Sequence, residues 1–152
     1  MAYELSDIKA ALNTIISAVV GIGQVHSRER YTQDPATFKS LFLSVITGDI
    51  NGCCITRSAY LPELALSSQV RKRHEMTIWC VYGYKDSDNS ASTFQTLVSA
   101  IVDAINGNLT YADAWHVFQD GQGAVASLIE IREWAGYFVH YAEIKVTVEV
   151  RA

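Results

Sequence analysis

The segment from Tyr137 to Val150 alternates between apolar and polar side chains almost without interruption. The apolar positions are Ala142, Ile144, Val146, Val148 and Val150. The positions between them are Glu143, Lys145, Thr147 and Glu149. Because successive side chains of a β-strand point to opposite faces of a sheet, the pattern predicts a strand with one face on a core. The other face should meet water or a polar partner.

The segment from Met76 to Tyr84 is largely apolar on both alternating faces, which is typical of a central strand covered on both sides. A polar loop from Lys85 to Ser90 leads into a predicted helix from Asn89 to Gly107. Its apolar stripe comprises Phe94, Leu97, Val98, Ile101, Val102 and Ile105. This spacing indicates a helix with one buried face, and Gly107 provides the C-terminal stop.

The first half of the chain predicts two helices and two strands. Apolar residues at helical spacing predict a helix from Leu5 to Val19, followed by stop signals at Gly21 and Gly23. Asp34-Pro35 provides the N-cap and first-turn proline of a second helix that continues through Val45. The predicted strands are a short, mostly polar edge strand at Gln24–Tyr31 and a strand at Cys53–Tyr60 that leaves a turn at Asn51-Gly52.

The remaining segments are shorter, and Leu61 to His74 is predicted to be a loop or extended arm without regular structure. The other predictions are strands at Trp115–Gln119 and Leu128–Arg132, a turn at Gly121–Gly123 and a break at Trp134–Gly136. A chain of 152 residues is about the size of one domain. The sequence therefore predicts a single α/β (α+β) domain over residues 1–152, with a mixed, mainly antiparallel β-sheet flanked by helices.

The composition is poor in charge: 49% of the residues are hydrophobic and 18% are charged, against a usual charged share of about 25%. A partner chain is one way to cover such a surface. Residues 1–74 carry eight Lys/Arg and six Asp/Glu, whereas residues 75–152 carry four and ten. This asymmetry favours a subunit with two unlike surfaces and argues against a generally basic nucleic-acid-binding protein.

The three cysteines, Cys53, Cys54 and Cys80, lie in apolar, strand-like runs and lack the paired spacing of a zinc site. We interpret them as buried thiols of a protein in a reducing compartment. The N-terminus has no basic region, and the apolar run from Ile15 to Ile22 is interrupted by Ser17 and Gly21. We therefore expect neither a signal peptide nor a membrane span.

The order of these pieces resembles the tail terminator, or tail-completion, proteins of long-tailed bacteriophages and prophages. The resemblance rests on the N-terminal helix, the strand His74–Tyr82, the loop Asp86–Ser92 with its long helix, and the strand Val139–Ile144. It implies a tail-terminator-like fold and a structural virion protein, made in the host cytoplasm, that forms a ring, typically a hexamer, at the head-proximal end of the tail tube. Such a ring stops tube growth and presents a docking face to the head.

The implied partners are further copies of the chain, the tail tube protein, a neck or head-completion protein and, in a contractile tail, a sheath protein. Genomic DNA would pass through the ring without specific binding, and an acidic lumen wall formed by the C-terminal half would repel it. No membrane partner and no cofactor are expected. A neck or head-closure protein is the alternative within virion assembly.

Two groups of residues are candidates for the subunit or partner interface. Arg71, Lys72 and Arg73, followed by His74, form a basic cluster that would bind nucleic acid or an acidic partner surface, or simply be a solvated arm before a buried strand. Trp134, Tyr137 and Phe138 flank a glycine in a predicted hairpin, where large apolar side chains are hard to bury within one subunit.

Signals for catalysis are weak. The four histidines are at 26, 74, 116 and 140, without a zinc-protease, serine-hydrolase or phosphate-loop motif. His116, beside Trp115 and near Asp113, is the residue on which a small-molecule-binding or hydrolytic alternative depends. We expect no catalytic or metal-binding residue, and we expect function to reside in the surface.

Overall fold

A computed structural model describes residues 5–44, 49–64, 70–108, 110–111, 115–117 and 123–151. Its helices are α1 (Leu5–Ser17), α2 (Pro35–Phe42) and α3 (Ser90–Asn106), with a short 3-10 helix η1 (Asp86–Asp88) before α3. Its strands are β1 (Gln24–His26), β2 (Asn51–Leu64), β3 (Val70–Gly83), β4 (Thr110–Tyr111), β5 (Trp115–Val117), β6 (Val125–Trp134) and β7 (Tyr137–Arg151). The chain forms a single α+β domain, as predicted.

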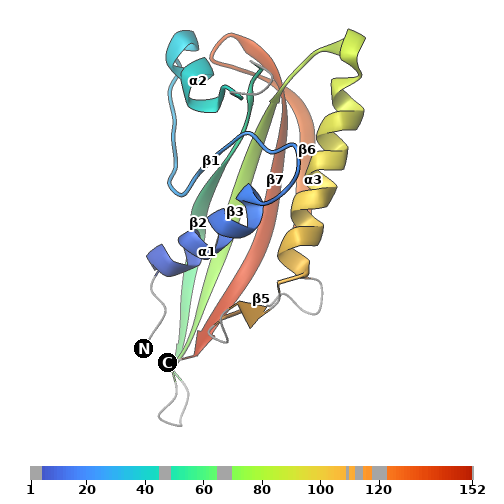
Figure 1. Cartoon of the computed structure of the whole chain (residues 1–152). Coiled ribbons are helices and arrows are strands. Elements are labelled where there is room, and N and C mark those ends of the chain that lie inside the picture. The colour runs from blue at the N-terminus through green and yellow to red at the C-terminus, as the bar shows by residue number, and fades with distance from the viewer. Residues whose placement is uncertain are drawn as a thin grey trace.

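The body of the sheet has the strand order β1-β2-β3-β7-β6, and Figure 1 shows its long, twisted strands. β1 is parallel to β2, whereas β2, β3, β7 and β6 pair antiparallel in succession. The short strands β5 and β4 continue the sheet beside the C-terminal end of β7. β7 therefore pairs with β3 along one side and with β6 and then β5 along the other.

Each face of the sheet carries its own hydrophobic core. Helices α1 and α3 pack on one face, against the even-numbered residues of β3 and β7, which include Met76, Ile78 and Ile144. Helix α2 packs on the other face through Phe38 and Phe42, against Trp79, Val81 and their neighbours. The predicted two-sided cover of the central strand is confirmed, and so is the buried apolar face of the last strand.

The residue that caps α2 and the residue that follows α3 agree with the sequence prediction. The Asp34 carboxylate accepts a hydrogen bond from the Thr37 backbone N–H at 2.9 Å, so it is the N-cap of α2 as predicted. Gly107 follows α3 at its C-terminus, also as predicted. All three cysteines are buried and free, which confirms the buried-thiol interpretation. Among the described residues, no helix is long and apolar enough to cross a membrane.

Two predictions for the β2–β3 region were wrong. Asn51 and Gly52 are not a turn but the first residues of β2, where Gly52 pairs with both Val81 and Gln24. A Cβ at Gly52 would lie 2.8 Å from the Phe42 ring, so the glycine provides close packing rather than a turn. The supposed arm from Leu61 to His74 belongs, in its described parts, to one long antiparallel hairpin of β2 and β3.

Other boundaries differ by a few residues. β1 ends at His26 rather than Tyr31, although its edge position is confirmed. β6 is longer than predicted at both ends, and the break at Trp134–Gly136 is the turn between β6 and β7. The second helix ends at Phe42 rather than at Val45, because Leu43 is extended and forms an antiparallel bridge with Ile50. The end of the short strand at Gln119 and most of the Gly121–Gly123 turn lie outside the described residues.

Candidate subunit interface

The turn between β6 and β7 sends its aromatic residues to two different faces of the sheet. Ala135 and Gly136 have φ angles of 51° and 81°, which is the left-handed pair that a two-residue hairpin turn requires. The register across this turn pairs Trp134 with Tyr137 and Glu133 with Phe138. Since paired residues share a face, Phe138 points away from Trp134 and Tyr137.

Trp134 and Tyr137 join the aromatic core beneath α2. The Trp134 ring centroid lies 5.0 Å from that of Trp79 and 5.5 Å from that of Phe38, and Tyr137 stacks on Phe38 at 6.0 Å. Both side chains are partly buried by these contacts. Two of the three predicted anchors therefore have packing partners within their own subunit.

Phe138, the third predicted anchor, is 65% exposed and lies on the α3 face of the sheet. Ile129 and Ile131 lie on the same face of β6 and are 46% and 54% exposed. The backbone N–H of Tyr84 donates to the Phe138 carbonyl, and the Tyr84 side chain is 42% exposed. We call Tyr84, Ile129, Ile131 and Phe138 the apolar strip.

The sequence reasoning missed Ile129 and Ile131, although the signal was present. Leu128 and Trp134 lie on one face of β6, and Ile129 and Ile131 lie on the other. β6 therefore carries apolar side chains on both faces. An edge strand with two apolar faces, one of which packs on a core, must expose the other or cover it with a partner.

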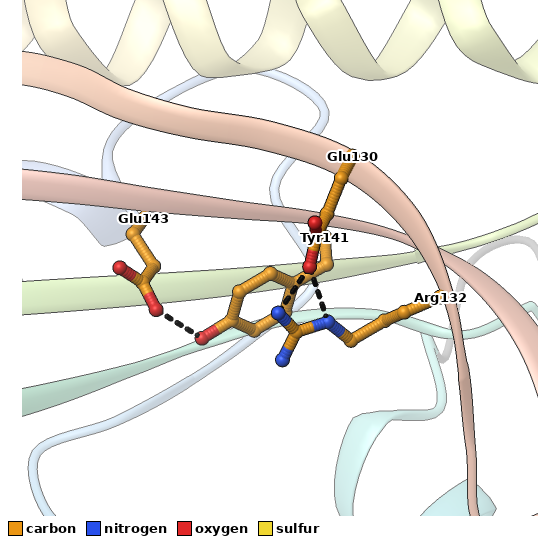
Figure 2. A network of polar contacts seen from close by, with 4 residues as sticks. All are labelled: Glu130, Arg132, Tyr141 and Glu143. Carbon is orange, nitrogen blue, oxygen red and sulfur yellow. Dashed lines mark hydrogen bonds and ion pairs between the residues drawn. The ribbon is translucent and has the colours of Figure 1, made fainter.

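On the opposite face, β6 and β7 carry an ordered polar network, which Figure 2 shows. The Arg132 guanidinium lies 3.7 Å from the centroid of the Tyr141 ring and donates to the Glu130 carboxylate through Nε and Nη2. The Tyr141 hydroxyl donates to Glu143 Oε1 at 2.9 Å. Burial, followed by the bond to Glu143, raises the pKa of Tyr141, so its hydroxyl stays a neutral donor.

The basic cluster lies in β3, so its interpretation as a solvated arm was wrong. Lys72 pairs with Pro62 and Val150, and Arg73 pairs with Leu61 and Glu149. Arg73 Nε lies 3.6 Å from Glu149 Oε2. As neighbours in a strand, Lys72 and Arg73 point to opposite faces, so the two do not form a single patch. Arg71 occupies the same strand, and its side chain is outside the described set.

A serine–histidine pair occurs inside the fold, but its surroundings are structural. Ser90 Oγ lies 2.8 Å from His140 Nε2, and the same hydroxyl accepts the backbone N–H of Lys85 at 2.8 Å. Both residues are 4% exposed, and Phe94 stacks on the imidazole. The hydroxyl therefore has two partners within the fold, the Lys85 backbone N–H and the His140 ring, and it is shielded from a substrate.

Of the other histidines, His26 has a contact that joins two elements of the fold. The His26 Nε2 atom lies 2.7 Å from the Leu41 carbonyl oxygen, which ties β1 to α2. The side chain of His116, on which the hydrolytic alternative depended, is outside the described residues, as is Asp113. Among the residues that the structure describes, no three His, Cys, Asp or Glu side chains are grouped to hold a metal ion.

A cavity of about 490 Å³ opens between the end of α1 and the start of α3. Its lining is uncharged and includes Gly21, Asn51, Tyr82, Thr96 and Leu97. Asn51 is 6% exposed and donates from Nδ2 to the Gly21 carbonyl at 2.8 Å. Its Oδ1 atom is buried and accepts no hydrogen bond from the described residues.

Comparison with models of known protein families found no match, and neither did comparison with curated proteins.

Proposed function

We propose that the chain is a structural subunit of a phage virion, a tail terminator that assembles with copies of itself into a ring on the tail tube. The proposal combines the sequence resemblance with one observation, the presence of unlike surfaces on the two sides of the sheet. A closed ring uses a heterologous contact, in which two different patches of the same subunit meet. The apolar strip provides one such patch on the α3 face.

The second patch is the part of the opposite face that α2 leaves uncovered. Here β2, β3 and β7 present polar side chains around a hollow of about 200 Å³, which is lined partly by Ser58, Glu75 and Lys145. These three residues are exposed, whereas the residues of the core beneath α2 are buried. The proposed ring thus has a distinct apolar side and a distinct polar side on each subunit.

Under this proposal the ring stops growth of the tube protein and offers its other end to a neck or head-completion protein. DNA passes through it, and the acidic character of the C-terminal half favours a lumen that does not retain the duplex. A neck or head-closure role would use the same kind of ring.

The test is assembly of the whole chain, measured by light scattering and negative-stain imaging with and without purified tail tubes. The wild type should form rings and shorten tubes when added during tube polymerisation. Phe138→Ala should prevent ring closure without unfolding the subunit, because most of the side chain is exposed. Val20→Ala is the matched control, since Val20 is 94% exposed and lies outside the apolar strip. Wild-type protein that neither forms rings nor alters tube length would refute the proposal.

A second candidate function is binding of a small neutral molecule, and the uncharged lining of the cavity beside α3 is the observation that favours it. The cavity volume falls within the range of ligand sites. We would screen small amides and polyols by thermal shift, with Thr96→Trp to fill the cavity and Ser99→Trp as a control on α3. Binding that Thr96→Trp abolishes and Ser99→Trp retains would support this function, and the absence of any binder in the screen would count against it.

A further inference from the structure

β6 is an edge strand, and its segment Leu128–Trp134 contains neither a bulge nor a proline. Among the described residues it pairs with β7 alone, so its outer backbone groups face no other strand. It has a bulge between Ala126 and Leu128, and from Leu128 to Trp134 the register is regular. Natural proteins protect such edges with bulges, prolines or charges, because an open ladder pairs with another chain.

The other long edge of the sheet is protected. β2 has a bulge between Arg57 and Ala59, and Pro62 follows it in the same strand. A proline cannot donate to a ladder, and a bulge interrupts one. The partner that best fits β6 is therefore not β2 of another subunit.

The regular part of β6 is complementary to itself. Leu128–Trp134 has Ile131 at its centre, with Glu130 before it and Arg132 after it. When two copies pair antiparallel about Ile131, Glu130 of each copy faces Arg132 of the other. Centring the pair on Glu130 or on Arg132 instead would oppose like charges, which destabilises a strand pair.

The side chains are already arranged for this contact. Glu130 and Arg132 are bound to each other on the α2 face, yet their side chains remain 38% and 39% exposed (Figure 2). Across a two-fold axis they would form an alternating network of two carboxylates and two guanidinium groups. On the α3 face, the exposed Ile131 side chains of the two copies would meet at the centre.

We infer that free subunits form two-fold dimers through antiparallel β6–β6 pairing centred on Ile131. Such a contact joins two copies and does not close a ring. The pairing covers Ile129 and Ile131, so the apolar strip of a dimerised subunit is not available for the ring contact. This last point rests on the proposed function: ring assembly would then start only from subunits that have left the dimer.

The test is the solution mass of the whole chain, by light scattering over a concentration series, for a pair of charge variants. Glu130→Arg places two cations on each edge, and Arg132→Glu places two carboxylates there. Each variant alone should raise the dimer dissociation constant on the order of tenfold or more relative to wild type. An equimolar mixture should form heterodimers, because each cation then faces a carboxylate.

Matched controls keep the total charge change but move it away from the edge. Glu29→Arg and Arg28→Glu change exposed residues of the segment after β1 by the same charge as the two edge variants, and both should dimerise like wild type. Circular dichroism checks that every variant is folded. Ile131→Lys is a third edge variant that should also be monomeric, independently of the Arg132 contacts with Tyr141.

A monomeric wild type at every concentration, or a mixture of the two edge variants that stays monomeric, would overturn the inference. These measurements contain no tail tube, so either result leaves the ring proposal standing. Conversely, the dimers could behave as expected while the protein never forms rings on tail tubes. That result would refute the proposed ring and support the β6–β6 dimer.

Discussion

The turn between β6 and β7 makes a quantitative prediction, because it places two large aromatic residues in opposite environments. Trp134→Ala removes a partly buried indole from the core beneath α2, and truncation of a fully buried aromatic costs about 3–5 kcal/mol. For partial burial we expect a loss of about 2–3 kcal/mol. Phe138 is 65% exposed, so Phe138→Ala should cost less than about 1 kcal/mol.

These free energies convert into a measurable difference in melting temperature. With an unfolding entropy of about 2.1 cal/mol/K per residue, a chain of 152 residues melts about 3 °C lower for each kcal/mol lost. Trp134→Ala should therefore lower the Tm by about 6–9 °C and Phe138→Ala by less than about 3 °C.

The assay is thermal and urea unfolding followed by far-UV circular dichroism, in dilute samples shown by light scattering to share one association state. Only then does the difference in melting temperature measure the stability of the subunit rather than that of the assembly. If Phe138→Ala destabilised the monomer as much as Trp134→Ala, the division of the hairpin into a core face and an open face would be wrong.

Three further predictions concern buried groups. Gly52→Ala should lower the free energy of unfolding in urea by about 2–3 kcal/mol, because the new Cβ would lie 2.7 Å from the Gln24 carbonyl oxygen and 2.8 Å from the Phe42 ring. Gly83→Ala is the control and should be nearly neutral, since the nearest atoms to its Cβ lie at 3.7 Å. Burial lowers the pKa of His140, so the unfolded chain takes up a proton first and stability should fall below about pH 6.5; an unchanged pH profile in His140→Gln would contradict this. Burial raises the pKa of Cys54 to about 12, so the native thiol should resist a thiol reagent at pH 8, and stability should fall above about pH 9 as the unfolded thiol ionises.

The sequence predicted the elements whose pattern is local. The stripe of α3, the Asp34 cap and the alternation of β7 each follow from the periodicity or chemistry of neighbouring residues, and each appears in the structure. The fold class followed from their order. Helix and strand periodicity is a property of a few consecutive residues, so one sequence suffices to detect it.

The errors arose where distant packing overrides a local signal. Asn51-Gly52 has the composition of a turn, but Gly52 is required because β1 and the Phe42 ring approach the backbone there. The segment containing Pro62 suggested a loop, yet proline is accepted because β3 supplies the pairing on one side and the other side of β2 is an edge. Neither contact can be read from neighbouring residues.

The candidate interface shows the same limit. The sequence correctly indicated that aromatic side chains cluster around Gly136, but only the register divides Trp134 and Tyr137 from Phe138. Likewise, Lys72 and Arg73 are consecutive in the chain, and their separation onto two faces follows from the extended backbone of β3. Sequence proximity identified the region, and pairing determines which side chain is available to a partner.

The two proposed contacts impose opposite demands on the apolar strip, and this makes them jointly testable. The ring requires Phe138 to be free, whereas the β6–β6 dimer covers Ile129 and Ile131 beside it. Weakening the dimer should therefore favour the ring by mass action. Glu130→Arg removes the dimer without altering the apolar strip, so it should cap tail tubes at lower concentration than wild type. Phe138→Ala should lose capping while retaining the dimer. If both variants changed capping in the same direction, the contacts would not compete, and the dimer would have no part in controlling assembly.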